Sequence, residues 1–232
     1  MKEKALPQFP NFDEEDELKS QGYELIAGID EVGRGALAGP VVASAVILPY
    51  PANLSWFGLV RDSKELNSKK RESLFDLINK EAVAVGIGIV PPQVIDSINI
   101  LKATRLAMME AVEKLPTQPS FLLIDRVTLS QCPIPQRGIT RGDKVCLSIA
   151  CASIIAKVTR DRMMEEFDQL YPGYGFTRHK GYGTRSHISC LQKLGPSPVH
   201  RLYFAPVRNV IISQNLPSSK GRDVVQTEFP LL

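Results

Sequence analysis

Four acidic residues of this sequence fall at the ends of predicted elements, where carboxylates can gather into one site. Asp30 follows the apolar run "LIAGI" and is followed by Glu31, Asp125 ends "SFLLID", and Asp143 comes just before a long apolar stretch. Because ligands collect at the carboxyl ends of strands in open α/β sheets, we expect the four to share one edge of a sheet. Gathered carboxylates repel one another, and Mg²⁺ or Mn²⁺ relieves that repulsion through oxygen ligands. The sequence therefore predicts a site for one of these cations.

Each acid also has an ordinary structural interpretation, such as ending a strand, capping a turn or capping a helix. These roles are individually commoner, and a shared site is favoured because all four acids fall at element ends. Adjacent strand residues point to opposite faces of a sheet, which is an obstacle for Asp30 and Glu31. Three alternatives overcome it: the strand breaks at "VGRGALAG", Glu31 offers its backbone carbonyl, or its longer side chain reaches round.

Glycine-rich and basic segments supply candidate contacts for a phosphate or a sugar. In "GRG", Gly33 and Gly35 let backbone N–H groups approach a ligand closely, and Arg34 can bind a phosphate. The segment "YGFTRHKGYGT" places Tyr182 and other aromatics among basic residues, which suits stacking on a base or sugar. Further candidate phosphate contacts are Lys64, Lys157, Arg160 and Lys180. Solvated charges and packed glycine turns are the competing interpretation of these segments.

The elements that position these residues alternate between strands and helices. Apolar runs predict strands over 23–30, 39–48, 83–90 and 120–125. Helical spacing predicts helices over 68–82, capped by Ser68, and over 91–100, 101–115 and 146–171. This order predicts an α/β fold, a mixed sheet flanked by helices with a small C-terminal helical appendage. We expect a lead-in over 1–20, a catalytic domain over 21–212 whose helical segment begins near 171, and a flexible tail over 213–232.

The composition is that of a globular protein, and the charge distribution is compatible with a polyanion-binding surface. Of the 232 residues, 44% are hydrophobic and 23% are charged, and the longest apolar run, "VVASAVIL", is too short to cross a bilayer. Residues 1–125 hold 13 Lys or Arg against 18 Asp or Glu, whereas residues 126–222 hold 15 against 5. A basic half beside an acidic half indicates a polyanion-binding surface next to carboxylate chemistry, although a solvated basic face gives the same pattern. Without a signal region, and with four cysteines that lack CxxC spacing, we expect a cytoplasmic protein with structural thiols.

Six segments, in this order, make the sequence resemble the ribonuclease HII family. They are "GIDEVGRGALAGPVVASAVIL", "DSKELNS", "LLID", "GDKVCLSIACASIIAKVTRDRMM", "YPGYGFTRHKGYGT" and "GPSPVHR", within residues 23–206. The resemblance implies a ribonuclease H-like fold, two divalent metals, cleavage of the RNA strand in RNA–DNA duplexes, and nicking of DNA at embedded single ribonucleotides. The sister family, ribonuclease HIII, is less similar, because it lacks this tyrosine and GRG combination and has an extra N-terminal domain.

The resemblance also implies a role for each site residue. The family's four metal-binding, catalytic acids correspond to Asp30, Glu31, Asp125 and Asp143. Its substrate-binding loop, whose backbone reads the ribose 2′-OH, corresponds to Gly33, Arg34 and Gly35. Tyr182 falls on the tyrosine that stacks on the sugar after the ribonucleotide. The sequence departs from the family pattern at Arg126, where glycine usually follows the third acid, and at "IACAS", which replaces a run of alanines.

With those roles, the residues fit two-metal hydrolysis of a phosphodiester. Two ions about 3.5–4 Å apart would flank the scissile phosphate, one activating water and the other stabilising the leaving 3′-oxygen. No side chain then acts as nucleophile, which agrees with a sequence that has no Ser-His-Asp or Cys-His arrangement. We expect a cut on the 5′ side of the ribonucleotide that leaves 3′-OH and 5′-phosphate ends.

Two other functions stay open, a nuclease of the same fold that is blind to the sugar and a non-catalytic RNA–DNA binder. The four acids argue against the binder, because bare carboxylates repel phosphate. We expect a monomer whose partners are RNA–DNA hybrids or DNA with embedded ribonucleotides, with no membrane contact. The tail segment "QTEFPL", Gln226 to Leu231, resembles peptides that bind the bacterial sliding clamp, although Phe229 stands where leucine is commoner.

Overall fold

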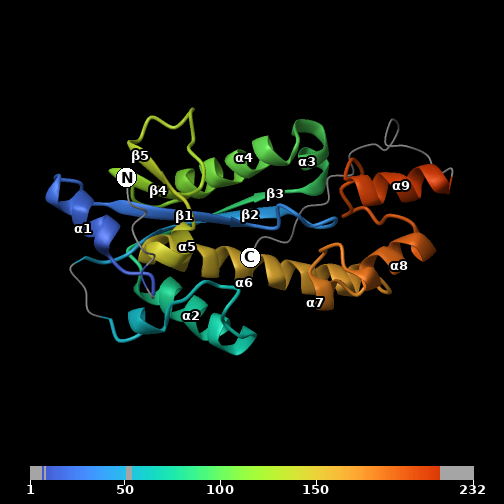
Figure 1. Cartoon of the computed structure of the whole chain (residues 1–232), viewed down its shortest axis with the longest axis horizontal. Helices are drawn as coiled ribbons and strands as arrows, with labels where there is room; N and C mark the ends of the chain where they lie inside the picture. The colour runs from blue at the N-terminus through green and yellow to red at the C-terminus, as the bar shows by residue number, and fades with distance from the viewer. Residues whose placement is uncertain (1–6, 8, 51–53, 215–232) are drawn as a thin grey trace.

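The computed structural model describes residue 7, residues 9–50 and residues 54–214, and their centre is a five-stranded mixed sheet. Its strands are β1 (Ile26–Val32), β2 (Val41–Ile47), β3 (Ala84–Val90), β4 (Phe121–Asp125) and β5 (Gln136–Ile139). The strand order is β3-β2-β1-β4-β5, antiparallel on the β2 side of β1 and parallel on the β4 side (Figure 1). The predicted mixed α/β sheet is confirmed, and β5 is an additional strand that the apolar pattern did not predict.

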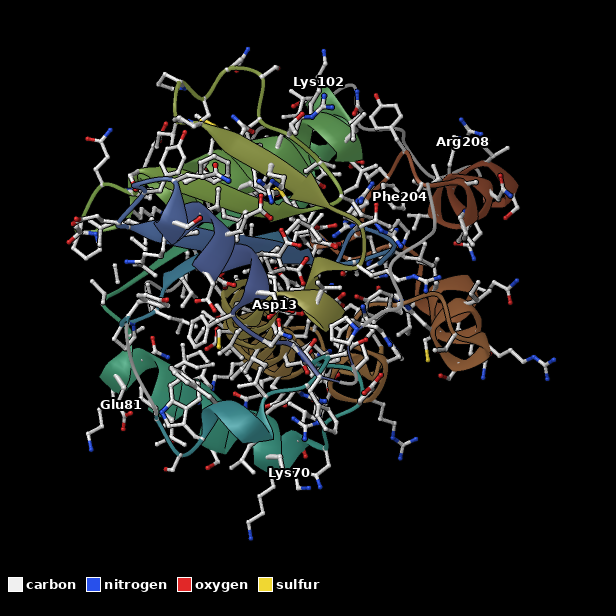
Figure 2. All side chains as sticks on the ribbon, turned by 60° about the vertical axis from the view of Figure 1, so that its left-hand side comes forward. Asp13, Lys70, Glu81, Lys102, Phe204 and Arg208 are labelled. Carbon is white, nitrogen blue, oxygen red and sulfur yellow. The ribbon has the colours of Figure 1, made fainter. Side chains whose placement is uncertain are left out.

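Helices cover both faces of this sheet. α3 (Pro92–Ile98) and α4 (Ile100–Glu113) lie on one face, whereas α2 (Ser68–Glu81) and α6 (Leu147–Leu170) lie on the other (Figure 1). Figure 2 shows Lys102 and Lys70 pointing outward on opposite sides of the molecule, as expected for helices with one buried face. No helix in the described part of the chain is both long and apolar enough to span a membrane.

Glycines let the helices pack unusually close to the sheet. A Cβ at Gly28 of β1 would lie 2.2 Å from the backbone carbon of Ser148 in α6. At Gly88 of β3, it would lie 1.9 Å from the carbonyl oxygen of Ala107 in α4. Both distances are far below van der Waals contact, so these positions exclude any larger residue. The contact at Gly28 brings α6 directly beneath the strand that carries Asp30.

The first predicted helix is confirmed, but its cap is not the predicted one. α2 begins at Ser68, and the residue before it, Asn67, accepts a hydrogen bond from the Lys70 N–H through its side chain at 2.9 Å. Ser68 as the N-cap is therefore wrong by one residue. Asn and Ser are both favoured N-cap residues, and only the backbone conformation decides between neighbours.

The N-terminal helix α1 (Asp13–Ser20) packs against the start of α6. Its Glu15 is buried and accepts hydrogen bonds from the Ser148 N–H at 3.0 Å and from the Cys146 thiol at 3.2 Å. A carboxylate that binds the N–H groups of a helix start stabilises that helix. Burial of this carboxyl raises the pKa of Glu15.

Three shorter helices form the C-terminal end of the described chain. They are α7 (Phe176–His179), α8 (Arg185–Leu194) and α9 (Ala205–Ser213), and they lie beyond the C-terminal half of α6 (Figure 1). This arrangement confirms the predicted helical C-terminal part. The predicted boundaries of the lead-in, the catalytic domain and the tail stay predictions, and residues 215–232 lie outside the described residues.

Candidate active site

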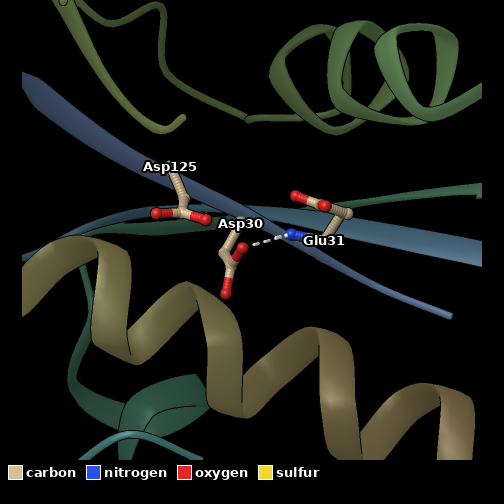
Figure 3. Close-up of side chains that lie close together, drawn as sticks. All are labelled: Asp30, Glu31 and Asp125. Atoms are coloured by element: carbon tan, nitrogen blue, oxygen red, sulfur yellow. Dashed lines mark hydrogen bonds between the residues drawn. The ribbon is translucent and has the colours of Figure 1, made fainter. Parts of the chain in front are cut away.

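Three of the four predicted acids meet at the end of β1. Asp30, Glu31 and Asp125 each offer a carboxylate oxygen, and these oxygens lie within 4.8 Å of one another. Figure 3 shows the three side chains converging beside α6. Asp30 and Glu31 come from β1, and Asp125 is the last residue of its parallel neighbour β4. The parallel pairing thus does what the sequence predicted, because it brings two carboxyl ends to one edge.

Glu31 reaches the cluster without a break in the strand. β1 stays paired with β2 up to Val32, which excludes the first of the three alternatives, a break in the strand. Its pairing with β4, however, ends at Ile29, which leaves the β4 side of the last residues open. Asp30 points towards α6, and the Glu31 carboxylate turns back from the other side of the strand towards Asp125 (Figure 3). The longer side chain therefore overcomes the strand alternation.

Backbone N–H groups hold two of these carboxylates. The Glu31 N–H donates to Asp30 Oδ1 at 2.7 Å, and the Gly142 N–H donates to Asp125 Oδ1 at 2.8 Å. Gly142 begins the short helix α5 (Gly142–Val145), which also carries Asp143. One hydrogen bond thus couples the end of β4 to the element that positions the fourth acid.

Asp143 lies in the same cleft as the three clustered acids but outside their tight group. The cleft has a volume of about 590 Å³, and all four acids line it. Asp143 is buried and pairs with the Lys64 ammonium at 3.6 Å. The cleft walls also include Asp62 and Ser63, which are both buried. The sequence analysis did not identify these two residues as site residues, although they lie in the segment "DSKELNS".

The acid cluster is electrostatically strained. Burial raises the pKa of Asp30 well above its usual range, and the neighbouring Glu31 and Asp125 carboxylates raise it further. Burial also raises the pKa of Asp125, with added repulsion from Asp143 and Glu31, while the Gly142 N–H acts in the opposite direction. A divalent cation would remove this repulsion.

The donor set fits a hard cation. Each of the three clustered residues offers a carboxylate oxygen, and Mg²⁺ and Mn²⁺ prefer oxygen ligands. Neither a histidine nor a cysteine lines the cleft in the described chain, so the nitrogen and sulfur ligands typical of zinc are missing there. The cysteines are free thiols, as predicted.

The GRG loop follows directly from the acid-bearing strand. Arg34 binds Glu31 through an ion pair of 3.1 Å, and Gly33 has a φ of 94°, which glycine adopts readily. A Cβ at Gly33 would lie 2.3 Å from Arg160 Nε, whereas nothing lies within 4 Å of that position at Gly35. The loop is therefore packed tightly on one side and open at Gly35.

Two fully buried arginines bind backbone carbonyls of the GRG loop and of the segment that follows it. Arg160 of α6 donates to the carbonyls of Pro40, Ala38 and Lys180 at 2.9–3.0 Å. Arg201 donates to the carbonyls of Gly39 and Arg34 at 2.9–3.1 Å. The prediction that Arg160 contacts phosphate is wrong, because its side chain is buried and engaged in these bonds.

Tyr182 is joined to the loop and lines the cleft. It pairs with Ala36 as an isolated antiparallel bridge, and the Arg160 guanidinium lies 5.4 Å from the centre of its ring. The tyrosine and the acids therefore line one cavity, whereas Gly33, Arg34 and Gly35 are not among its lining residues. The other aromatic residues of the segment "YGFTRHKGYGT", Tyr174 and Phe176, are buried in a stacked pair with ring centres 5.2 Å apart, so they are not available to stack on a base or sugar.

A hydrogen-bonded chain of histidines holds the Tyr182 carbonyl. The Ser197 N–H donates to His200 Nδ1 at 2.9 Å, so His200 carries its proton on Nε2. That proton faces His187 Nε2 at 3.0 Å, and His187 Nδ1 in turn donates to the Tyr182 carbonyl at 3.0 Å. This direction of donation requires both rings to be neutral. Sequence reasoning missed this network, because histidines 13 residues apart show no local pattern.

The predicted lysine contacts lie in different places. Lys64 and Lys157 line the cleft, where they pair with Asp143 and Asp161. Lys180 is not among the cleft residues, and its ammonium binds Glu165 at 2.7 Å. Nucleic-acid contact by these lysines stays a prediction.

Residues 27–207 match the family model described as Ribonuclease HII. The chain belongs to the ribonuclease HII family. Ribonuclease HII of Dehalococcoides mccartyi is 54% identical over 202 residues, which cover 87% of this chain and 95% of that protein. Ribonuclease HII of Bacillus pumilus is 56% identical over 197 residues, which cover 85% of this chain and 76% of that protein.

Solved structures of related enzymes share the fold. Ribonuclease H2 from Pyrococcus horikoshii superposes with a TM-score of 0.69 at 24% identity, over 83% of this chain and 99% of that one. Ribonuclease HII from Archaeoglobus fulgidus, solved in a complex with PCNA, superposes with a TM-score of 0.61 at 23% identity, over 84% of this chain and 90% of that one. Bst-RNase HIII in complex with Mn²⁺ superposes with a TM-score of 0.61 at 19% identity, over 82% of this chain and 70% of that one. The predicted ribonuclease H-like fold is confirmed.

Proposed function

We propose that this chain hydrolyses the RNA strand of RNA–DNA hybrids and nicks duplex DNA on the 5′ side of an embedded ribonucleotide, leaving 3′-OH and 5′-phosphate ends. Membership in the ribonuclease HII family makes the chain a ribonuclease H hydrolase. The observation that carries the finer proposal is the cleft that the carboxylate cluster shares with Tyr182, which bridges to Ala36 just beyond the glycine loop.

Four acids would hold Mg²⁺ or Mn²⁺, two ions in the catalytic complex: Asp30, Glu31, Asp125 and Asp143. The bound ions supply an activated water and stabilisation of the leaving 3′-oxygen. Asp30 and Asp125 are pre-positioned for binding by the N–H groups of Glu31 and Gly142, which hold one oxygen of each. Their raised pKa values mean that cation binding competes with protonation, so metal affinity should rise with pH.

Sugar recognition would come from the loop and the tyrosine. Gly35 leaves open space where any other residue would carry a Cβ, so backbone N–H groups there can approach a ribose 2′-OH, the group that distinguishes RNA from DNA. Arg201 would hold the loop through its hydrogen bond to the Arg34 carbonyl, and Arg160 would hold the segment that follows through the Ala38 carbonyl. Tyr182 would stack on the next sugar, held by its bridge to Ala36.

The test is cleavage of a labelled RNA–DNA hybrid by the wild-type chain and by Asp125→Asn. The wild type should cut only with Mg²⁺ or Mn²⁺, and the variant should lose at least about 100-fold in kcat, since a missing ligand weakens both metal binding and transition-state stabilisation. A matched control is Asp76→Asn, which removes a carboxylate on α2 that does not line the cleft. Equal activity with and without metal would refute the proposal.

We further propose that the tail segment Gln226–Leu231, with Phe229 at its centre, binds a replication sliding clamp. These residues lie outside the described part of the chain. The support is the sequence pattern, and the Archaeoglobus fulgidus relative was solved in a complex with PCNA. Clamp binding by the full chain should be lost when residues 226–232 are deleted. Unchanged binding would refute this contact.

A further inference from the structure

Two arginines on the wall of the acidic cleft have a backbone conformation that disfavours arginine. Arg126 has a φ of 62° and Arg141 a φ of 59°, both in the left-handed region. A Cβ is strained there, which is why glycine normally occupies such positions. Among the described residues other than glycine, only Asn99 and Lys180 share this conformation. Two of four such residues are therefore arginines that line one cleft.

Arg126 directly follows Asp125, and Arg141 directly precedes the residue that holds the Asp125 carboxylate. A hydrogen bond of 2.8 Å from the Val127 N–H to the Asp125 carbonyl closes a three-residue turn around Arg126. Arg141 directly precedes Gly142, whose N–H binds the Asp125 carboxylate. Turns this tight occur mainly where the surrounding structure enforces them. Glycine would adopt both backbone conformations without strain, so the side chains at 126 and 141 call for another explanation.

Neither of these two side chains forms an ion pair, although the positive charge of Arg126 acts to lower the pKa of Asp125. Five cations line the cleft, and three of them form ion pairs: Lys64 with Asp143, Lys144 with Glu65 and Asp62, and Lys157 with Asp161. Arg126 and Arg141 are exposed, and within the described chain neither guanidinium has an ion-pair or hydrogen-bond partner. The two strained positions of the cleft thus carry its two unpaired cations.

We propose that Arg126 and Arg141 form a clamp that binds backbone phosphates of the nucleic acid. A guanidinium fork matches a phosphate with two parallel hydrogen bonds, and an exposed, unpaired one is available for it. The clamp lies where β4 and β5 end and α5 begins, near the N-terminal end of α6, whereas Tyr182 packs on Arg160 in the second half of α6 (Figure 1). The strand would therefore be held on both sides of the acids. This inference rests on the proposed function.

The proposal predicts opposite effects on stability and on binding. Arg126→Gly relieves the left-handed strain, so the melting temperature should rise by about 2–4 °C or stay unchanged. The same change removes one phosphate contact, so affinity for the hybrid should fall about ten-fold. The slope of log affinity against log salt concentration should become shallower by about 1. A residue with a purely structural role would not alter this slope.

The experiment measures binding of a fluorescent RNA–DNA hybrid in Ca²⁺ over a series of salt concentrations. The proteins are the full-length wild type, Arg126→Gly, Arg141→Gly, Arg126→Lys and Arg105→Gln. Arg105→Gln is the matched control, because it removes an exposed arginine from α4, away from the cleft. We expect shallower slopes for both glycine variants, and wild-type slopes for Arg126→Lys, which keeps the charge, and for the control.

The outcomes separate this inference from the proposed function. If the wild type binds and cleaves the hybrid and both glycine variants bind with its slope and affinity, the clamp is refuted while the proposed function stands. An equal loss of slope in Arg105→Gln would also refute it, because the effect would then be one of net charge alone. If the wild type neither binds nor cleaves the hybrid, both fail.

Discussion

Replacing His187 and His200 by residues with neutral amide side chains should make the free energy of unfolding depend less on pH between pH 7 and pH 5. The two rings form the chain of hydrogen bonds that ends on the Tyr182 carbonyl, and each ring must be neutral for its donors and acceptors to match. A proton added to His187 would place two N–H groups face to face at 3.0 Å. The perturbation is the double variant His187→Asn/His200→Gln, which cannot take up that proton.

The magnitude follows from the pKa values of the two histidines. Burial lowers the pKa of His187 to about 4 and that of His200 to about 3, and the charge of the neighbouring ring adds to the effect at His200. The unfolded chain, with histidine pKa values of about 6.5, therefore binds more protons at pH 5 than the folded chain. Unfolding free energy then falls as the pH decreases below about 6.5. The loss between pH 7 and pH 5 is about 2 kcal/mol for one such histidine and about 2–4 kcal/mol for the coupled pair.

The assay is urea unfolding at pH 7 and pH 5, followed through the fluorescence of Trp56, the single tryptophan, which is buried. The double variant should be less stable than the wild type at pH 7 but should lose less on acidification. Glu15, Asp30 and Asp125 have raised pKa values, so their titration acts in the opposite direction, and it acts equally in both proteins. The same pH dependence in wild type and variant would refute the reasoning.

Two further changes test the packing of the site. Tyr182→Ala should weaken the preference for cleavage at a ribonucleotide–deoxyribonucleotide junction. Mn²⁺ binding, measured by calorimetry, should stay unchanged. Equal losses of activity on all-RNA and junction substrates would count against the role of the ring. Gly28→Ala should destabilise the fold by about 1–3 kcal/mol in urea unfolding, because its Cβ would lie 2.2 Å from the Ser148 backbone; an unchanged midpoint would contradict the close approach of α6.

The acid cluster was predictable because element ends carry a strong signal. Apolar runs ending in Asp30 and Asp125 predicted strands that bring these acids to one edge, and the parallel pairing of β1 with β4 confirms this. How Glu31 joins them was not predictable, because it depends on where the β4 pairing ends. β5 was missed for a related reason: its residues, Gln136–Ile139, are only partly buried and show no apolar run.

The buried residues that hold the site in place could not be predicted from the sequence. Arg160 and Arg201 look like surface charges, yet both are fully buried and bind the Pro40 and Gly39 carbonyls that follow the GRG loop. Buried charges of this kind follow from tertiary contacts between distant segments, which no local pattern records. The histidine chain is similar, since Ser197, His200 and His187 meet only after the C-terminal helices have packed. The sequence showed that Arg126 stands where the family pattern usually has glycine, but it did not show the backbone conformation of this residue.

The central claim is that one cleft both cuts a phosphodiester and reads the 2′-OH beside it. The most direct test maps cleavage at nucleotide resolution on three DNA duplexes that differ at one sugar, which is ribose, 2′-deoxyribose or 2′-O-methylribose, with Mg²⁺ or Mn²⁺ present. We predict a single nick on the 5′ side of the ribose, with 3′-OH and 5′-phosphate ends, and no nick in the other two duplexes. Cleavage of all three duplexes at similar rates would contradict the claim.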